Sequence, residues 1–87
     1  MISVRFTGTG TATTSDQELA TGNYTYIYAT NSGAVDLYLS PTDSTSSARV
    51  IVAAGTSRYI PLNDNRAKVL HYSCASSTCG FIVECFE

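Results

Sequence analysis

Four side chains near the carboxyl end of the sequence are the best suited to metal binding or nucleophilic chemistry. They are His71, Cys74, Cys79 and Cys85. Structural zinc sites favour short ligand spacings such as Cys-x-x-Cys, and no such spacing occurs in the sequence. His71 and Cys74 also lie three positions apart in an expected strand, so their side chains leave opposite faces of it. The sequence therefore predicts no metal site, and no motif in it indicates a bound cofactor.

The cysteines lie in two expected strands, 68–74 and 79–87, which we predict to form a closing hairpin around a loop at 75–78. In this register one face carries Leu70, Tyr72, Cys74, Cys79, Phe81, Val83 and Cys85. Cys74 then lies opposite Cys79, with Cβ atoms ~4.5–5.5 Å apart, close to what a disulfide requires. The alternative is buried thiols, which synthesis in a cytoplasm favours. Because the chain has three cysteines, at least one is unpaired within it.

Nucleophilic catalysis needs a nucleophile, a base and a group that orients the base. The only histidine, His71, lies in the middle of an expected strand, where a structural role is the better interpretation. The carboxylates Asp36, Asp43, Asp64 and Glu84 belong to different turns or faces, so no acid–base pair is indicated. The sequence predicts no catalytic residue, and we expect a protein that is not an enzyme.

The charge and composition argue against nucleic acids and membranes as partners. The net charge is −2, and the five basic residues are spread along the 87 positions without a cluster that could neutralise a run of phosphates. No apolar run is long enough for a membrane span, and the first residues have no signal-peptide core. We therefore expect synthesis and folding in a cytoplasm. A domain of this size would gain stability by assembling with other proteins.

The stretch 23–40 predicts the central hairpin of the domain, with a loop at 31–33. A three-residue loop places Ile27 opposite Leu37 and sorts the aliphatic residues onto one face, whereas a two-residue loop would mix the two faces. Three-residue hairpin loops commonly end on a glycine in the left-handed conformation. We therefore expect Gly33 to have a positive φ.

The opposite face of this hairpin is expected to carry Tyr24, Tyr26, Tyr28 and Tyr38. One interpretation is an inner face of a sandwich, with the hydroxyl groups reaching its rim. Another is a contact surface for a protein partner, because tyrosine is enriched at protein interfaces. A third is a platform for carbohydrate. The four tyrosines are thus the candidate partner interface.

The remaining expected strands complete an all-β fold. Short strands at regular spacing, separated by turn residues and without a helical period, predict a small antiparallel β-sandwich or barrel-like fold of about six or seven strands. We divide this single domain into residues 1–22, an N-terminal strand and a flexible arm rich in Gly and Thr, and residues 23–87, the body of the sandwich. The segment 1–14 could become ordered when the protein docks on a partner.

Three segments carry a resemblance to a known group of proteins. In order they are TNSGAVDLYLS, the apolar strand leading into AGTSRYIPL, and YSCASSTCGFIVECFE. Together they resemble the small β-sandwich structural proteins of tailed bacteriophage particles, over residues 23–86. Those proteins share a strand–TN(S/T)G–strand opening, a central turn of the AGTS type and a terminal hairpin with small residues at its tip. The terminal cysteines of this sequence depart from that pattern.

The resemblance implies a non-enzymatic virion structural protein that stabilises or decorates a phage capsid. Its partners would be the major capsid protein, other virion proteins or further copies of itself, and it would have no catalytic residues. A component of the neck, tail or fibre is the alternative within the same particle. A different class is a carbohydrate-binding or adhesion module that uses the tyrosine face.

Overall fold

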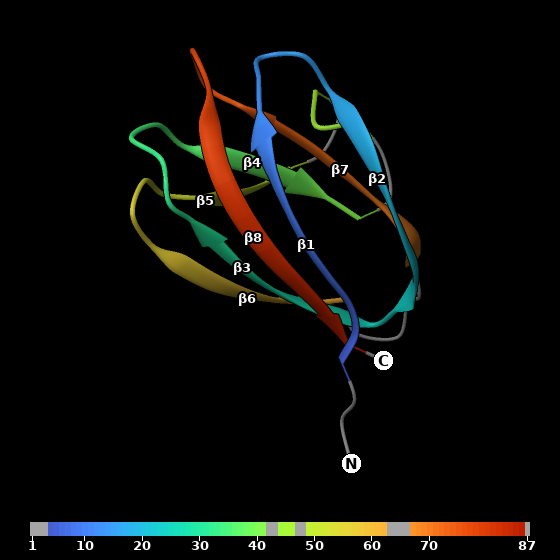
Figure 1. The fold of residues 1–87 in the computed structure, drawn as a ribbon. Coiled ribbons are helices and arrows are strands. Elements are labelled where there is room, and N and C mark those ends of the chain that lie inside the picture. The colour runs from blue at the N-terminus through green and yellow to red at the C-terminus, as the bar shows by residue number, and fades with distance from the viewer. Residues whose placement is uncertain (1–3, 42–43, 47–48, 63–66, 87) are drawn as a thin grey trace.

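The computed structural model describes residues 4–41, 44–46, 49–62 and 67–86, and those residues form strands and turns without a helix. Figure 1 shows the eight strands. Their bounds are β1 (Val4–Ala12), β2 (Gln17–Tyr24), β3 (Tyr26–Asn31), β4 (Leu37–Ser40), β5 (Val50–Val52), β6 (Ser57–Pro61), β7 (Ala67–Cys74) and β8 (Cys79–Phe86). None of the described segments is a helix that could cross a lipid bilayer.

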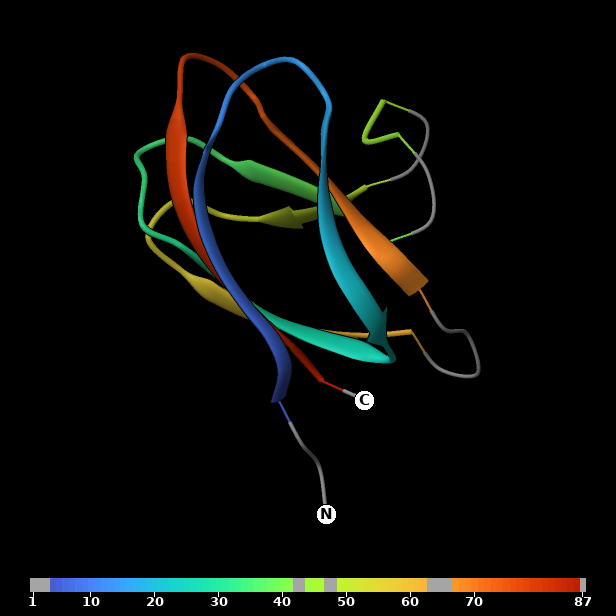
Figure 2. The ribbon, with the colours of Figure 1, turned by 45° about the vertical axis from the view of Figure 1, so that its right-hand side comes forward.

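The strands form two antiparallel sheets of four strands each, packed face to face (Figures 1 and 2). Sheet A has the order β1-β8-β3-β6, and sheet B has the order β2-β7-β4-β5. The first strand thus pairs with the last, the second with the seventh, the third with the sixth and the fourth with the fifth. This is the arrangement of a jelly roll, an eight-stranded double-sheet fold. The predicted β-sandwich is confirmed, with eight strands rather than six or seven.

The predicted central hairpin is wrong, because β3 and β4 lie in different sheets. β3 pairs with β6 and β8, whereas β4 pairs with β5 and β7. The sorting of the side chains is nevertheless correct, since Ile27 and Ala29 in β3 and Leu37 and Leu39 in β4 are all buried. Alternation fixes which side chains of a strand point inward, but it does not say which strand lies beside it.

A buried asparagine at the end of β3 turns the chain from one sheet to the other. The Asn31 side-chain amide donates hydrogen bonds to the carbonyl oxygens of Val35, at 2.8 Å, and Val52, at 2.9 Å. Its carbonyl oxygen accepts bonds from the backbone N–H of Gly33, at 2.8 Å, and the thiol of Cys79, at 2.9 Å. Asn31 therefore uses both donor hydrogens and two acceptor sites, and it connects the 33–35 turn with β5 and β8.

Gly33 has a different role from the one expected. Its φ is not positive; among the described glycines only Gly22, at 75°, and Gly55, at 71°, lie in the left-handed region. A Cβ atom at position 33 would lie 2.9 Å from the Cα of Cys79. The glycine is needed because the turn passes directly over the backbone of β8.

The closing hairpin is also corrected. β7 belongs to sheet B and β8 to sheet A, so Cys74 pairs with Leu37 and Cys79 pairs with Ala12. All seven residues predicted to share one face point into the space between the sheets, where six are buried and Tyr72 packs against the core. The predicted face is right because both strands turn the same alternate residues toward one core.

The N-terminal arm is not confirmed for the residues that the structure describes. Residues 4–12 form β1, which pairs with β8 along its length, and β2 lies beside β7 in the other sheet. The sandwich therefore includes most of the segment 1–22, and residues 1–3 lie outside the described part. Gly10, which belongs to the segment expected to form the strand and flexible arm, faces inward beneath the ring of Phe81, whose nearest carbon would be 3.0 Å from an added Cβ. The small residue makes room for the ring.

Candidate functional site

The outer face of sheet A presents a group of apolar and aromatic side chains to solvent. We call Tyr26, Tyr28, Tyr59, Ile82 and Phe86 the aromatic patch. Tyr26 lies between Pro61 and Phe86 in the sheet, and Tyr28 lies between Tyr59 and Glu84. The exposed fraction is 42% for Tyr28, 53% for Tyr59 and 45% for Ile82. These values are high for large apolar residues in strands, so the patch is a surface on which another molecule could pack.

Ring contacts give the aromatic patch a fixed shape. The Tyr26 ring stacks on Phe86, with centroids 4.8 Å apart and planes 9° apart, and it meets Tyr59 at 5.0 Å in a tilted arrangement. Partial burial, and then the proximity of Tyr59, raise the pKa of Tyr26, so its hydroxyl is neutral at physiological pH. Rigid aromatic side chains lose little conformational entropy on binding and supply both apolar area and a polar hydroxyl group.

The four tyrosines predicted to share one face are divided among three environments. Tyr26 and Tyr28 are in the aromatic patch, as alternation from the buried Ile27 requires. Tyr24 is buried, its hydroxyl donates to the Val69 carbonyl oxygen at 2.8 Å, and burial raises its pKa. Tyr38 lies on the outer face of sheet B. The prediction that all four tyrosines share one face is therefore wrong, because β2, β3 and β4 do not form one meander.

Sequence reasoning missed Tyr59, Ile82 and Phe86 as members of the surface. A signal for Tyr59 was present, because it neighbours the inward-facing Ile60 in β6 and so must face outward. Its position beside Tyr28 depends on the pairing of β6 with β3. That pairing spans a long stretch of chain and leaves no local trace in the sequence.

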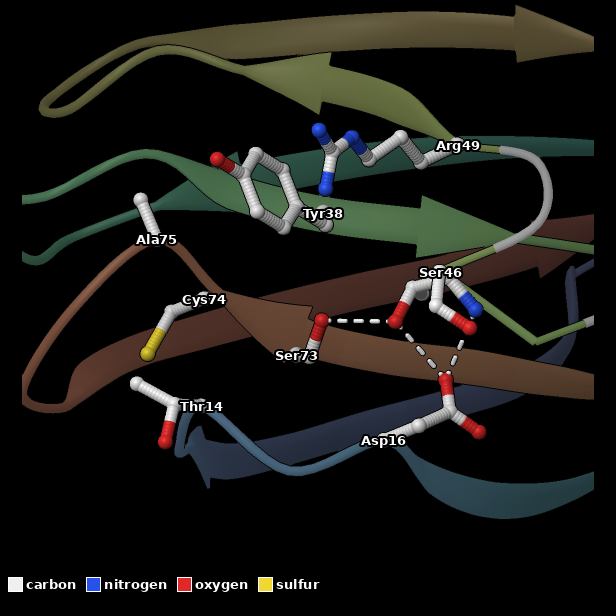
Figure 3. Close-up of a pocket in the computed structure, with 9 residues that line it drawn as sticks. Thr14, Asp16, Tyr38, Ser46, Arg49, Ser73, Cys74 and Ala75 are labelled. Carbon is white, nitrogen blue, oxygen red and sulfur yellow. Dashed lines mark hydrogen bonds between the residues drawn. The ribbon is translucent and has the colours of Figure 1, made fainter.

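A second candidate site is a pocket on the outer face of sheet B (Figure 3). Its volume is about 290 Å³, and its lining is mainly polar: Thr14, Asp16, Tyr38, Thr45, Ser46, Arg49, Ser73, Cys74 and Ala75. Tyr38, Ser73 and Cys74 belong to sheet B, and Ala75 follows β7. The connection between β1 and β2 supplies Thr14 and Asp16, and the connection between β4 and β5 supplies the rest. None of these residues was predicted to form a site together.

Hydrogen bonds anchor that connection to the sheet. One carboxylate oxygen of Asp16 accepts from the backbone N–H of Thr45, at 2.9 Å, and from its hydroxyl, at 2.8 Å. The Thr45 hydroxyl also lies 2.6 Å from the hydroxyl of Ser73 in β7. Thr45 and Ser73 are buried as a result. The loop is thus held against the sheet, and the pocket depends on this anchor.

The other carboxylate oxygen of Asp16 lies 2.9 Å from Nδ1 of His71, and Nε2 of His71 lies 3.6 Å from Glu18. Burial alone would raise the pKa of Asp16, but the hydrogen bonds from Thr45 and His71 outweigh it and lower the pKa below 3.8. The Thr45 hydroxyl contacts the carboxylate and the Ser73 hydroxyl contacts Thr45, whereas a Ser-His-Asp triad needs the hydroxyl on the histidine. The geometry orders a loop and does not activate a nucleophile.

Arg49 lies on the other side of the pocket from Asp16. Its guanidinium carbon is 4.1 Å from the centroid of the Tyr38 ring, and Figure 3 shows the side chain extended along that ring. Such a cation–π contact contributes about 0.5–1 kcal/mol at an exposed site. The contact therefore favours one position of an otherwise exposed side chain.

All three cysteines are free, buried thiols in this structure, which is one of the two states that the sequence left open for Cys74 and Cys79. Sγ of Cys74 lies 3.4 Å from the carbonyl oxygens of both Ser76 and Ser77, which share its single S–H donor. Burial, and then the nearby Cys74, raise the pKa of Cys79, while burial raises the pKa of Cys85 to about 11. In the described part of the chain, no group of three or more His, Cys, Asp or Glu residues is arranged to hold a metal ion.

Comparisons with known proteins bear on the fold. No family model matches the sequence, and no curated protein is a significant match. Among solved structures, PirA is similar over 94% of this chain and 94% of its own, with a TM-score of 0.62 and 10% identity. A de novo designed double-stranded β-helix, solved by solution NMR, is similar over 93% of this chain and 97% of its own, with a TM-score of 0.55 and 12% identity. At such identities the similarity concerns the fold alone.

Proposed function

We propose that this protein is a non-enzymatic structural protein of a phage virion, which stabilises or decorates the capsid by packing on capsid subunits through the aromatic patch. The observation that carries the proposal is the set of ring contacts among Tyr26, Tyr59 and Phe86 on the outer face of sheet A. On the same face, Tyr28, Tyr59 and Ile82 are exposed. Tyrosine and other aromatic residues are enriched in the centres of protein interfaces, where charged residues are depleted. The resemblance of residues 23–86 to small virion proteins supplies the identity of the partner.

Composition and fold agree with this proposal. A net charge of −2 with few charged residues gives a surface that can approach a partner without large electrostatic cost. The eight-stranded jelly roll is used by viral capsid domains and by lectins, although a fold by itself does not determine function. Further copies of this chain, or proteins of the neck and tail, would be alternative partners for the same surface.

The test compares two isoleucines that differ in their sheet but not in their exposure. Ile82 lies in the aromatic patch and is 45% exposed, whereas Ile51 lies on the outer face of sheet B and is 43% exposed. We expect Ile82→Lys to abolish co-sedimentation with capsids that lack the protein, because it places a charge in a desolvated contact. Ile51→Lys is expected to sediment like the unchanged protein.

The mass of the purified protein in solution is measured alongside. A closed oligomer that Ile82→Lys dissociates would identify a second copy as the occupant of the patch. Equal sedimentation of both variants, or a monomer indifferent to capsids, would refute the proposed interface. Circular dichroism of both variants verifies that the fold is intact.

Carbohydrate recognition by sheet A is the second candidate. The observation that favours it is the adjacent pair Tyr28 and Tyr59, whose exposed rings lie side by side in the sheet. Glycan-array binding that is lost in Tyr59→Ala and kept in Tyr38→Ala would support this function over the capsid role.

A further inference from the structure

The pocket on sheet B contains a positioned cation that has no hydrogen-bond acceptor. The Tyr38 ring holds the Arg49 guanidinium, and among the residues that the structure describes none accepts a hydrogen bond from it. Arg58, an exposed arginine in β6 of sheet A, differs from Arg49, because it donates a hydrogen bond to the Ile51 carbonyl oxygen at 3.0 Å. A guanidinium group carries five N–H donors in a planar fork. Arg49 therefore has its full donor capacity available to a bound anion.

The charge of the pocket selects among anions. Asp16 also lines the pocket and is ionised at neutral pH, with its oxygens accepting from Thr45 and His71. A doubly charged phosphate would be repelled by this carboxylate, and Arg49 is the only Lys or Arg among the described residues of the lining. A carboxylate carries a single charge and pairs with one guanidinium through two parallel hydrogen bonds. The ligand group that fits Arg49 is a carboxylate.

The rest of the lining indicates what the carboxylate is attached to. Thr14 and Ser46 contribute hydroxyl groups that can donate and accept hydrogen bonds, whereas the Ser73 hydroxyl is buried and bonded to Thr45. The volume of about 290 Å³ lies at the lower end of the range for small-molecule sites, roughly 300–1,000 Å³. A hydroxylated molecule of the size of one sugar ring matches both properties, whereas a nucleotide is too large and too highly charged.

We propose that this pocket binds a sugar that carries a carboxylate, with the carboxylate on Arg49 and the ring hydroxyls against the Ser and Thr side chains of the lining. The Tyr38 ring holds the guanidinium in place before the ligand arrives, which lowers the ordering cost of binding. The site lies on the outer face of sheet B, across the molecule from the aromatic patch. It does not rest on the proposed capsid role.

The experiment is an NMR titration of the full chain at low salt with D-glucuronate, D-galacturonate and D-glucose. Glucose has the glucuronate ring with a CH₂OH group in place of the carboxylate, so the pair isolates the contribution of the charge. With at least one of the two acids we expect saturable chemical-shift changes of residues around the pocket. Glucose is expected to bind at least about tenfold more weakly than that acid. Arg49→Gln is expected to weaken binding of the acid about tenfold or more. Arg49→Lys keeps the charge but not the fork and should fall between.

Arg58→Gln is the matched control, because it removes an exposed arginine outside the pocket lining. Its dissociation constant for the acid is expected to equal that of the unchanged protein. The proposal is overturned if neither acid gives saturable shifts, if glucose binds as tightly as the acid that gives the shifts, or if Arg49→Gln and Arg58→Gln weaken binding equally. Each of these results leaves capsid sedimentation through sheet A unaffected, so the two proposals fail independently.

Discussion

The side chain of Asn31 is predicted to be the polar group on which the fold depends most. Asn31→Ala removes its four hydrogen bonds and leaves the carbonyl oxygens of Val35 and Val52 and the N–H of Gly33 without this partner. A typical hydrogen bond contributes about 1 kcal/mol, and a buried group left unsatisfied costs about 1–3 kcal/mol. We therefore expect a loss of about 3–5 kcal/mol in the free energy of unfolding.

This loss is large relative to the stability available. At roughly 0.05–0.15 kcal/mol per residue, a chain of 87 residues is stabilised by about 4–13 kcal/mol. Asn31→Ala should therefore unfold much of the protein near 37 °C or shift its urea midpoint by a large amount. Asn31→Asp separates hydrogen bonding from packing, because it keeps the volume but replaces both N–H donors with an oxygen that faces two carbonyl groups.

The assay is urea unfolding followed by far-ultraviolet circular dichroism at pH 7. Thr30→Ala, at the adjacent position, is the matched control, since it removes an exposed hydrogen bond of 2.9 Å to Ser57. Its cost is expected to stay within about 0.5 kcal/mol. If both Asn31 variants lie within about 1 kcal/mol of the unchanged protein, the inference that this side chain joins the two sheets is refuted.

Three further predictions concern the turn, the loop anchor and the thiols. Gly33→Ala should lower stability by roughly 1–3 kcal/mol, because its Cβ collides with the backbone of Cys79; an unchanged urea midpoint would contradict this. Asp16→Asn should destabilise the protein at pH 7, because the hydrogen bonds from Thr45 and His71 stabilise the fold while Asp16 is ionised. The pKa of this carboxyl is lowered below 3.8 in the folded protein, so the destabilisation should disappear as the pH falls through that pKa. Unfolding free energies measured from pH 7 down to the pH at which NMR shows Asp16 to be protonated test it, and a loss that stays constant over this range would exclude the anchor. Cys85, with a pKa of about 11, should resist iodoacetamide at pH 8 in the folded protein and react in urea; mass spectrometry that finds labelling of the native protein at the rate of a free thiol would show that it is accessible.

The inward and outward faces of single strands were predictable from the sequence, whereas the neighbours of those strands were not. The alternation in β3 correctly buries Ile27 and exposes Tyr28, because successive side chains of a strand point to opposite faces. The same residues gave a convincing register for a hairpin with β4 that does not exist. A turn that folds a chain back and one that crosses to the facing sheet have similar compositions. What separates them here is Asn31, whose partners include the distant Val52.

The candidate sites were predictable only where they depend on one strand. Tyr26 and Tyr28 were correctly assigned a common face, but Tyr59 joins them through a pairing between separate segments of the chain. The pocket on sheet B depends on a hydrogen bond between the side chains of Asp16 and Thr45, which are 29 positions apart in the sequence. The glycines of residues 1–22 favoured the prediction of a flexible arm, whereas Gly10 lies inside strand β1 and makes room for the ring of Phe81.

The place of β8 in sheet A has a consequence for how the protein is made. β8 (Cys79–Phe86) lies between β1 and β3, so these two earlier strands have no common neighbour until β8 has been synthesised. On the ribosome the growing chain can pair β4 with β5 and β3 with β6, but sheet A stays open on the side where β8 belongs. Pairing of such distant segments closes large loops and is therefore slow. β8 completes the sheet from its middle, and sheet A is expected to close only after β8 has left the ribosome.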